Sequence, residues 1–324
     1  MTVIYRIADP KDSLNKAKFT YQTTGGIVVK DRHVLEWIDG LRIPPAWSNV
    51  VIYPSSKKQT CCGVDPAGRQ QCLYHKIHVS KARKEKYCGL IEFCLHYPQI
   101  LRDIDAKLAS SKLSKNRVTA LVLKIIIHCN FRLGTLKYEE QNESFGVTTV
   151  LKKHLKFRDD AAEFSFIGKK GVVNECIVRD AATVAALRDF HVAPHSDQHL
   201  MMYQFDGRWY VIKHTEINDY LKAWNPMFTS KDFRTYQSNI VMIDELEAHD
   251  PAKLTPAQRK KRIIETVRAV AAQVHNTPAI CKKDYIDTEL IMLYIEHPIR
   301  YRSLMITPTS SSRIRFMNWL KLKC

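Results

Sequence analysis

One tyrosine in this chain has the surroundings that a phosphoryl-transfer nucleophile needs. Tyr285 follows a helix-breaking turn at Thr277–Pro278 and stands beside the lysine pair Lys282–Lys283. A free tyrosine hydroxyl is a poor nucleophile at neutral pH, because its unperturbed pKa is about 10. Cations that stabilise the phenolate and neutralise a phosphate make its attack on a phosphodiester feasible. The pattern therefore predicts phosphoryl transfer if further cations gather around Tyr285.

The overall charge predicts a polyanionic partner. The 324 residues include 50 Lys plus Arg against 33 Asp plus Glu, which gives a formal net charge of +17 and a pI near 9.4. Nucleic acid is the commonest soluble polyanion that such a protein binds. The basic residues are interleaved with aromatic and small polar residues, which favours a folded surface that follows phosphates over a disordered basic tail. A basic soluble enzyme without a nucleic-acid partner is the alternative.

Composition also bounds the class of protein and its compartment. A hydrophobic content of 45% suits a soluble globular fold, and the length suits two domains. No uninterrupted apolar stretch of about 18 residues exists, so we expect no membrane partner. The segment Met1–Arg6 lacks the charged-then-apolar layout of a secretory signal. We therefore expect an intracellular protein that is not secreted.

The cysteines predict reduced thiols and no metal site. There are nine of them, an odd number without a framework spacing, which argues against disulfides. Residue types that bind zinc occur together at Cys61, Cys62, Cys72, His75 and His78. No Cys-x-x-Cys occurs there, and an alternation of polar and apolar residues explains the segment equally well. We expect no metal at this cluster.

The expected fold class is α+β, with a β-rich module over residues 1–80 and a mainly α-helical domain over residues 81–324. The first 80 residues read as short strands and turns bounded by Gly and Pro. The expected strands are Gly25–Lys30, Val50–Pro54 and Gln71–Tyr74, with a turn at Asp65–Gly68. From Lys81 onward the pattern changes to charged helices.

Three expected elements of the second domain would carry cations. An apolar helix over Lys115–Phe131 would deliver Arg132 at its end, with Gly134 as the stop. A hairpin over Glu163–Val178 would expose two lysines in its turn, Gly168–Gly171, where the glycines tolerate positive φ.

The third element is a helix that begins at Thr255 with a capping box and a first-turn proline. It carries a core-facing apolar stripe, has Lys260, Lys261 and Arg268 on its other faces, and ends at His275–Pro278. A further helix is expected to carry Tyr285 toward Pro298.

Several different short motifs follow one another in a fixed order along the chain. They are Phe131–Tyr138, Asn142–Gly146, Phe166–Lys169, Lys231–Tyr236, and Asn276-Thr277-Pro278 with Tyr285 nine positions after Asn276, preceded by Ile43–Trp47 and Asp65–His75. In this order and spacing they resemble the short type IB DNA topoisomerases of the poxvirus and bacterial kind, over residues 30 to 295. The resemblance implies the catalytic fold that these enzymes share with the tyrosine recombinases.

The resemblance implies a role for each matched residue. Tyr285 matches the tyrosine that attacks a DNA phosphodiester and becomes linked to the 3′-phosphate. Arg132 and Arg234 match the arginines that bind the non-bridging oxygens, which a guanidinium can do bidentately. Lys169 matches the general acid that protonates the departing 5′-oxygen, and Lys170 could lower its pKa. Taken singly, each of these side chains also has a structural reading, such as a helix cap, a solvated lysine or a salt-bridge partner.

The fifth matched position is a departure from the poxvirus pattern. Those enzymes have histidine there, whereas the Asn-Thr-Pro register selects Asn276, as in many bacterial relatives. His275 stands one residue earlier. An asparagine can donate a hydrogen bond to a phosphate oxygen but carries no charge. We therefore expect transition-state hydrogen bonding from Asn276, and a larger loss from His275→Ala than from Asn276→Ala would contradict this register.

Other residues that match the family pattern are expected to contact DNA. The expected contacts are Arg69, Gln71, Tyr74, Lys137 and Tyr138. Cys72 stands where family members often carry a DNA-contacting tyrosine, and Thr135 replaces a basic residue common in the poxvirus enzymes. A poxvirus-like pentanucleotide preference is therefore not expected.

The resemblance implies an enzyme that relaxes supercoiled duplex DNA. The two domains would surround the duplex as a clamp, and a phosphotyrosine linkage would conserve bond energy, so that neither ATP nor an obligatory metal is needed. No Gly-x-x-x-x-Gly-Lys-Ser/Thr phosphate loop occurs. We expect double-stranded DNA as the partner, no cofactor and a monomer. The short form and its departures suit a large DNA virus or a bacterium, and we favour the virus. The expected location is a viral factory, virion or host nucleus for a viral source, or the nucleoid for a bacterial one.

Two rival readings remain. A tyrosine recombinase shares the Arg, Lys, Arg, Tyr constellation, although recombinases usually show His-x-x-Arg where this chain has Lys231-x-x-Arg234. A non-catalytic DNA-binding protein with a decayed site is the other, and the presence of Tyr285, both arginines and Lys169 counts against it.

Overall fold

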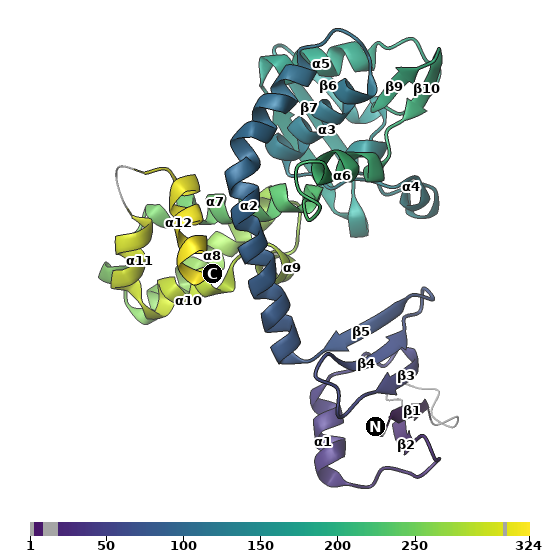
Figure 1. Ribbon diagram of the computed structural model, residues 1–324, viewed down its shortest axis with the longest axis vertical. Coiled ribbons are helices and arrows are strands. Elements are labelled where there is room, and N and C mark those ends of the chain that lie inside the picture. Colours follow the sequence, from purple (N-terminus) through teal and green to yellow (C-terminus); the bar gives the residue numbers. More distant parts are fainter. Residues whose placement is uncertain (1–2, 9–18, 307–309) are drawn as a thin grey trace. The chain divides into compact units, whose positions relative to one another are not determined.

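The computed structural model describes residues 3–8, 19–306 and 310–324 of the chain. The chain divides into two units, residues 1–86 and 87–324 (Figure 1). Each unit has its own apolar core. The expected α+β class is confirmed, because a β-rich first unit precedes a mainly helical second one. The boundary expected at residue 80 falls within helix α2 (Lys76–Leu108), which is continuous there. That boundary stays a prediction.

The first unit is built on one antiparallel sheet whose strand order is β2-β1-β3-β4-β5. Its strands are β1 (Ile4–Ala8), β2 (Phe19–Thr23), β3 (Ser48–Ile52), β4 (Gln59–Val64) and β5 (Gln70–Tyr74). Helix α1 (Arg32–Gly40) begins at the N-cap Asp31, whose side chain accepts from two backbone N–H groups. Ile38 of α1 joins the same apolar core as Ile52 and Cys61 of the sheet.

Two expectations for this unit are corrected. Gly25–Lys30 is not a strand but a turn, with Gly26 at φ 76° and a single bridge between Gln22 and Val28. The paired glycines allow the reversal, because the left-handed region costs glycine little. Helix α1 was not expected, although Val34 and Ile38 are spaced one helical turn apart behind an N-cap aspartate.

The expectation of reduced thiols is wrong. The structure contains three disulfides, Cys62–Cys72, Cys88–Cys324 and Cys129–Cys176, and leaves Cys61, Cys94 and Cys281 as buried free thiols. Cys62 and Cys72 are paired on the neighbouring strands β4 and β5. The partners in the other two disulfides are 236 and 47 positions apart, so only the tertiary fold brings them together. The Cys62–Cys72 bond joins two of the cysteines that were considered as zinc ligands.

The second unit contains most of the helices together with two small sheets. Its helices are α2, which begins in the first unit, α3 (Lys115–Cys129), α4 (Leu136–Asn142), α5 (Ala181–His191), α6 (His214–Lys222), α7 (Ser230–Glu247), α8 (Pro256–Gln273), α9 (Pro278–Asp284), α10 (Thr288–Glu296), α11 (Pro298–Met305) and α12 (Ser312–Lys323). Its strands are β6 (Leu155–Arg158), β7 (Ala161–Ile167), β8 (Val173–Val178), β9 (Met202–Phe205) and β10 (Arg208–Val211). Short 3₁₀ turns lie at Val147–Thr149, Lys152–His154, Lys169–Gly171 and Pro251–Lys253.

Helix α3 lies at the centre of this unit and is apolar on almost every side, as expected of a buried helix. It ends at Cys129, two residues earlier than predicted. Asn130 takes the left-handed conformation with φ 54°, which asparagine tolerates better than most residues, and so it serves as the C-cap that was expected at Gly134. Phe131 then enters the core and Arg132 leaves it.

The predicted hairpin is confirmed as β7–β8, with β6 added to form the order β6-β7-β8. Its tip is the turn Lys169–Gly171, in which Lys170 and Gly171 have φ of 64° and 73°. The disulfide Cys129–Cys176 joins β8 of this hairpin to the end of α3. The disulfide therefore joins the strand that follows the lysine tip to the end of α3, after which Arg132 follows.

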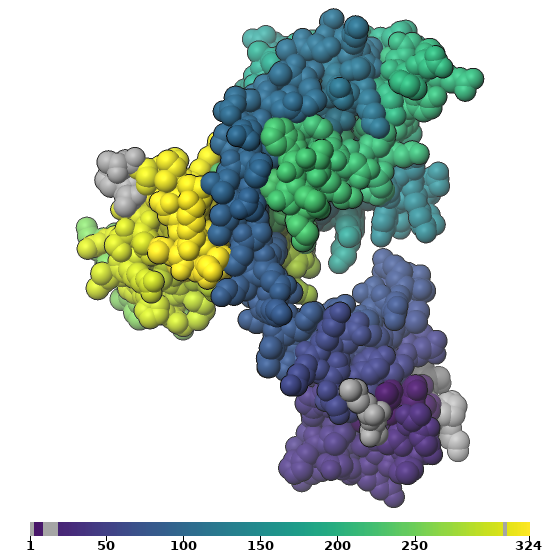
Figure 2. All heavy atoms as spheres, in the orientation of Figure 1, coloured from purple at the N-terminus to yellow at the C-terminus, as the bar shows by residue number. Residues whose placement is uncertain are grey.

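Helices α7 to α12 follow the segment that contains α3 to α6 and the two small sheets. Helix α8 has the predicted capping box between Thr255 and Gln258. Tyr285 does not lie within a helix as expected but is the C-cap of α9, because α10 begins only after the new N-cap Asp287. Residues of α12 (yellow) lie against α2 (blue) in the space-filling view (Figure 2), consistent with the disulfide between Cys88 and Cys324.

Over residues 3–8, 19–306 and 310–324, none of the helices combines the length and the apolarity needed to cross a bilayer.

Candidate active site

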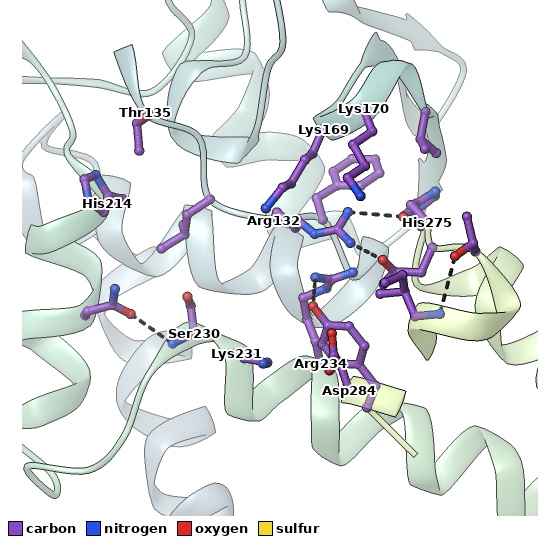
Figure 3. A pocket seen from close by; sticks show the side chains of 18 residues that line it. Arg132, Thr135, Lys169, Lys170, His214, Ser230, Lys231, Arg234, His275 and Asp284 are labelled. Carbon is purple, nitrogen blue, oxygen red and sulfur yellow. Dashed lines mark hydrogen bonds between the residues drawn. The ribbon is translucent and has the colours of Figure 1, made fainter. Parts of the chain in front are cut away.

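A cleft of about 690 Å³ in the second unit brings together the five catalytic residues that the sequence predicts. Its lining includes five Lys or Arg side chains against the single carboxylate of Asp284, as Figure 3 illustrates. The cations are Arg132, Lys169, Lys170, Lys231 and Arg234. Because opposite charges attract strongly where water is partly excluded, such a cleft favours an anion such as a phosphodiester.

Tyr285 and Arg234 are in direct contact at the floor of this cleft. The Nη1 atom of Arg234 donates to the Tyr285 hydroxyl oxygen at 2.7 Å, and both side chains are buried. Arg234 Nε donates to Asn130 O at 2.8 Å, and its Nη2 donates to Val274 O. The guanidinium is therefore held by three separate segments of the chain.

Burial changes the electrostatics of this guanidinium. Burial lowers the pKa of Arg234 to about 10 overall, with Arg132 adding to the shift and Tyr285 and Cys281 opposing it. At neutral pH Arg234 still carries its charge. A buried cation without a carboxylate partner among the described residues is costly to the fold, so a phosphate would be a favourable counter-ion for it.

Arg132 is positioned by the tight backbone turn that follows α3. Its backbone O accepts from Val147 N at 2.9 Å, and Gly134 N donates to Thr148 Oγ1 at 2.9 Å. A Cβ built on Gly146 would lie 2.4 Å from Gly134 N, so the two backbone segments touch as only glycines allow. The turn is therefore rigid where it presents the Arg132 side chain.

The segment from Val274 to Asn276 links the two arginines. Arg132 Nη1 donates to His275 O at 3.2 Å, and its Nη2 donates to Asn276 Oδ1. Val274 O accepts from Arg234, as described above. One short turn, with His275 at φ 50°, therefore supplies acceptors to both guanidinium groups.

The side chains of His275 and Asn276 point to different partners. The imidazole Nε2 of His275 lies 3.0 Å from Cys129 O, and its ring packs on Phe131. Burial lowers the pKa of His275, and the nearby arginines lower it further, so the ring is neutral and donates through Nε2. Asn276 instead contacts Arg132, and its Nδ2 donates to Val274 O at 3.1 Å.

Lys169 reaches the cleft from the hairpin tip. Both Lys169 and Lys170 are exposed, and Figure 3 shows their side chains extending from the tip toward Arg132. The tip backbone is closed by a hydrogen bond from Gly168 N to Val172 O at 2.8 Å. Within the described residues, Lys169 forms no ion pair, in contrast to the three hydrogen bonds of Arg234.

One lysine of the cleft was not assigned a role from the sequence. The Nζ atom of Lys231 lies 5.5 Å from the centre of the Tyr285 ring. Lys231 and Arg234 stand three residues apart on α7, a spacing that places both on one face of a helix. That spacing is the signal that could have identified Lys231.

The predicted DNA contacts lie in both units. In the first unit, Asp65 binds the Arg69 side chain at 2.8 Å and accepts from Gln71 Nε2 at 3.1 Å, and these hydrogen bonds lower the pKa of Asp65 to about 2. Tyr74 is exposed at the end of β5 and packs on His78.

In the second unit, Lys137 and Tyr138 are exposed on α4. Tyr138 lines a small cavity of about 160 Å³ together with Arg132 and Lys169, whereas Lys137 is not among the lining residues of either cavity. Thr135 caps α4 by accepting from Tyr138 N.

The chain matches two protein families. Residues 76–299 match the catalytic core of eukaryotic DNA topoisomerase I, and residues 18–62 match the N-terminal domain of bacterial DNA topoisomerase IB. The first match covers well over half of the chain.

Viral proteins are among the similar sequences. DNA topoisomerase 1B of Acanthamoeba polyphaga mimivirus is 31% identical over 275 residues, which cover 82% of this chain and 81% of the relative. DNA topoisomerase 1B of vaccinia virus (strain Copenhagen) is 22% identical over 269 residues, 82% of this chain and 83% of the relative. DNA topoisomerase 1 of rabbit fibroma virus is 23% identical over 278 residues, 81% and 82% of the two chains. The cationic cleft, the two family matches and these relatives agree: the chain belongs to the type IB DNA topoisomerase family.

Proposed function

We propose that this chain relaxes supercoiled duplex DNA by cutting one strand, letting it rotate and resealing it, without ATP or an obligatory metal. One observation carries the proposal. The Tyr285 hydroxyl lies 2.7 Å from Arg234 Nη1, in a cleft lined by five cationic side chains. A tyrosine hydroxyl held by a guanidinium, where a phosphate is attracted, is the arrangement that attack on a phosphodiester requires.

The proposed cleavage is a transesterification. The Tyr285 oxygen forms a bond to phosphorus and loses its proton to solvent, while the bond from phosphorus to the 5′-oxygen breaks. Lys169 gives a proton to that oxygen, which leaves as a 5′-hydroxyl, and the 3′-phosphate stays on the tyrosine. Resealing is the reverse reaction. Since one phosphodiester is exchanged for another, no nucleotide hydrolysis is needed.

Arg132, Arg234 and Asn276 are proposed to bind the charge that develops on the non-bridging oxygens. A guanidinium has five N–H donors. Arg234 uses one at each of its three nitrogens, so two remain for phosphate. Asn276 uses one of its two amide N–H groups for Val274 O, which leaves one. The contacts that hold these side chains therefore leave donors free for the transition state.

Binding of the duplex is proposed to involve both units, with one copy of the chain per site. The proposed contacts are Arg69, Gln71 and Tyr74 in the first unit and Lys137 and Tyr138 in the second. Each phosphate contact releases counter-ions, so the logarithm of the affinity falls with the logarithm of the salt concentration. We expect Arg69→Ala and Lys137→Ala each to reduce that slope by about 1 in a fluorescence-anisotropy titration. An unchanged slope would remove that residue from the contact set.

The decisive experiment uses negatively supercoiled plasmid with EDTA and without ATP. We expect the native chain to relax the plasmid and to form a covalent protein–DNA adduct. The variant Tyr285→Phe keeps the ring and its packing but lacks the attacking oxygen, so it should bind the plasmid without relaxing it. Its folding can be checked by circular dichroism.

The same experiment separates the rival functions. If neither protein relaxes the plasmid although both bind it, the hypothesis of a non-catalytic DNA-binding protein is favoured. If an adduct forms on linear duplex without relaxation, and two duplexes exchange strands, a recombinase is the better description. Relaxation that survives in Tyr285→Phe would exclude Tyr285 as the nucleophile.

A further inference from the structure

The backbone around Tyr285 is held from the side that faces away from the cleft. Tyr285 lies between α9 and α10, and its carbonyl oxygen accepts from Asn239 Nδ2 at 2.9 Å. The Oδ1 atom of the same asparagine accepts from Asp287 N at 2.8 Å. Asn239 is fully buried on α7. The position of Tyr285 is therefore coupled to that of Asp287 through one buried amide.

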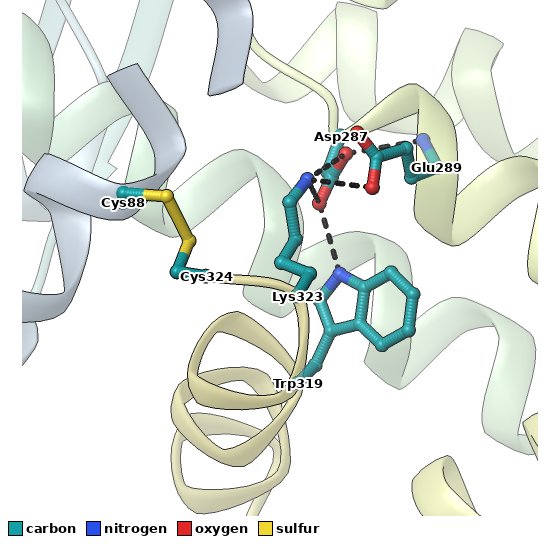
Figure 4. Close-up of a disulfide and its surroundings, with 6 residues drawn as sticks. All are labelled: Cys88, Asp287, Glu289, Trp319, Lys323 and Cys324. Atoms are coloured by element: carbon teal, nitrogen blue, oxygen red, sulfur yellow. Dashed lines mark hydrogen bonds and ion pairs between the residues drawn. A yellow bond between two sulfur atoms is a disulfide. The ribbon is translucent and has the colours of Figure 1, made fainter. Parts of the chain in front are cut away.

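The Asp287 carboxylate is fully buried and is bound mainly by α12. Trp319 Nε1 donates to Oδ2 at 2.9 Å, and Lys323 Nζ donates to both oxygens, at 2.9 and 3.1 Å (Figure 4). Lys323 is itself buried and also pairs with Glu289 at 3.3 Å. A buried carboxylate needs such partners, because an uncompensated charge in the interior is strongly unfavourable. The two α12 side chains therefore fix the segment that follows the tyrosine.

Helix α12 is in turn bonded to α2. The disulfide Cys88–Cys324 joins α2 to the residue that directly follows Lys323 (Figure 4). Lys323 Nζ also lies 4.8 Å from the centre of the Tyr87 ring, one residue before Cys88. The disulfide therefore restrains the last turn of α12 at the point where Lys323 meets Asp287.

We propose that α12 is a latch that positions the nucleophile. In this latch the disulfide Cys88–Cys324 keeps Lys323 on Asp287, and Asp287 keeps the Tyr285 backbone in place through Asn239. Lys323 and Asp287 touch neither the cleft nor the reacting atoms, so they are positioning residues. The inference rests on the proposed function, since it takes Tyr285 as the attacking group.

The latch affects the chemical step more than DNA binding. A nucleophile that is displaced by a fraction of an ångström loses its alignment with phosphorus, which lowers the rate steeply. The cations that attract the phosphate are held by other contacts, those of Arg132 with residues 275 and 276 and those of Arg234 with residues 130 and 274. Loosening the latch should therefore lower the rate of adduct formation at saturating DNA and leave the affinity for DNA unchanged.

The first test replaces Lys323 by Met, which keeps an unbranched side chain, one atom shorter, and removes the charge. We expect adduct formation in a single turnover to fall by about tenfold to a hundredfold, with unchanged DNA affinity and faster hydrogen exchange at residues 285–287. Lys323→Arg should restore most of the rate. The control is Lys321→Met, which removes an exposed lysine of the same helix and should change none of these quantities.

Lys323→Met leaves the buried Asp287 carboxylate without its cation, which could prevent folding. A second variant avoids this problem. Combining Lys323→Met with Asp287→Asn removes both charges, and the new amide oxygen can still accept from Trp319. If this double variant folds, forms adduct at the native rate and shows native exchange at residues 285–287, the latch is excluded. A reduced rate with faster exchange supports it.

The disulfide is tested separately with Cys88→Ser combined with Cys324→Ser. We expect a smaller loss of rate in the same direction as for Lys323→Met. A small dithiol reductant converts each disulfide into two thiols and itself becomes a cyclic disulfide. It should lower the rate by a larger factor in the native chain than in this double variant, because the other two disulfides are reduced in both. The matched control is Cys94→Ser, which changes a free cysteine of α2, leaves the disulfide intact and should keep the native rate. Native rates in the Cys88–Cys324 variant would remove the disulfide from the latch.

Failure of the proposed function gives a different result. If the native chain forms no adduct with duplex DNA, Tyr285 is not a nucleophile and the enzymatic reading fails. Hydrogen exchange at residues 285–287 would still report whether Lys323 and the disulfide hold this segment. Unchanged exchange in Lys323→Met, beside a native chain that does form adduct, overturns the latch alone.

Discussion

The two sides of the cleft hold their cations in different ways. On the arginine side, formed by Arg132 and Arg234, both guanidinium groups donate to backbone oxygens, and Arg234 is only 4% exposed. On the lysine side, formed by Lys169 and Lys170, the side chains extend from an exposed hairpin tip. Tyr285 belongs to the arginine side, because Arg234 binds its hydroxyl.

The difference matches what each proposed role needs. Stabilising a transition state requires donors that are already in place, since reorganising them during the reaction would cost part of their effect. A general acid must instead follow the oxygen that leaves, and an exposed side chain can adjust to it. We therefore expect substitutions on the arginine side to be the more severe, even when the charge is kept.

The largest effect is expected from Arg234→Lys. The lysine keeps a positive charge, but it cannot replace the planar fork that reaches Asn130 O, Val274 O and the Tyr285 hydroxyl together. We expect the rate of adduct formation to fall by about 10³, since one preorganised donor is worth about 10² to 10³ and the nucleophile also loses its partner. Quenched-flow measurement of the covalent adduct tests this.

Arg117→Lys is the matched control for that variant. Arg117 is equally buried, and it binds Leu108 O, Ser111 O and Asp189 at a distance from the cleft lining. The control should lose thermal stability while the folded protein keeps its cleavage rate. If the two variants lose rate equally, the effect at Arg234 comes from general destabilisation.

A smaller effect is expected from Lys169→Ala. Loss of a general acid costs about 10² to 10⁴ in rate, and we expect the lower end because Lys170 stands beside it and also lines the cleft. The thermal stability should not change, since the tip is exposed. Replacing the bridging 5′-oxygen of the DNA by sulfur should restore the rate, because a thiolate leaves without a proton.

The sulfur substrate also provides the control. It should not rescue Arg234→Lys, whose defect is not in the leaving group. Lys156→Ala, on the exposed face of β6, should leave both substrates unaffected. Failure of the sulfur substrate to rescue Lys169→Ala would exclude Lys169 as the proton donor.

Sequence reasoning located the elements whose signals are local. The turn Gly168–Gly171 lies where two glycines flank a lysine pair, and α8 begins where Thr255 and Gln258 form a capping box. Both signals depend on a few neighbouring residues, so they can be recognised without knowledge of the fold.

Signals that depend on the tertiary structure were missed or misplaced. Glycine often ends a helix, so Gly134 was expected to end α3, but Asn130 does so. Gly134 instead lies where its backbone touches that of Gly146. Tyr285 was expected within a helix, yet Asp287 starts a new one two residues later.

The same limit applies to the disulfides and to the second lysine of α7. Cys88 and Cys324 are 236 positions apart, and no local pattern joins them. Lys231 shares a helix face with Arg234, but only the fold shows that Tyr285 lies opposite that face. Long-range contacts of this kind decide the geometry of the site, whereas local patterns decide only which residues are candidates.

The smallest effect is expected from His275→Asn, which sharpens the comparison by testing the turn behind the arginine side. Asparagine tolerates the left-handed backbone at this position but does not titrate. Burial, with Arg132 and Arg234 nearby, lowers the pKa of His275 below its unfolded value of 6.5. The folded state therefore binds its proton less readily than the unfolded state, and stability is lost as the pH falls below 6.5 toward the folded pKa.

Denaturant unfolding at a series of pH values should show a steeper loss of stability on acidification in the native chain than in His275→Asn. Equal slopes would mean that His275 is solvated, and the turn would then have to be held by the arginine contacts alone.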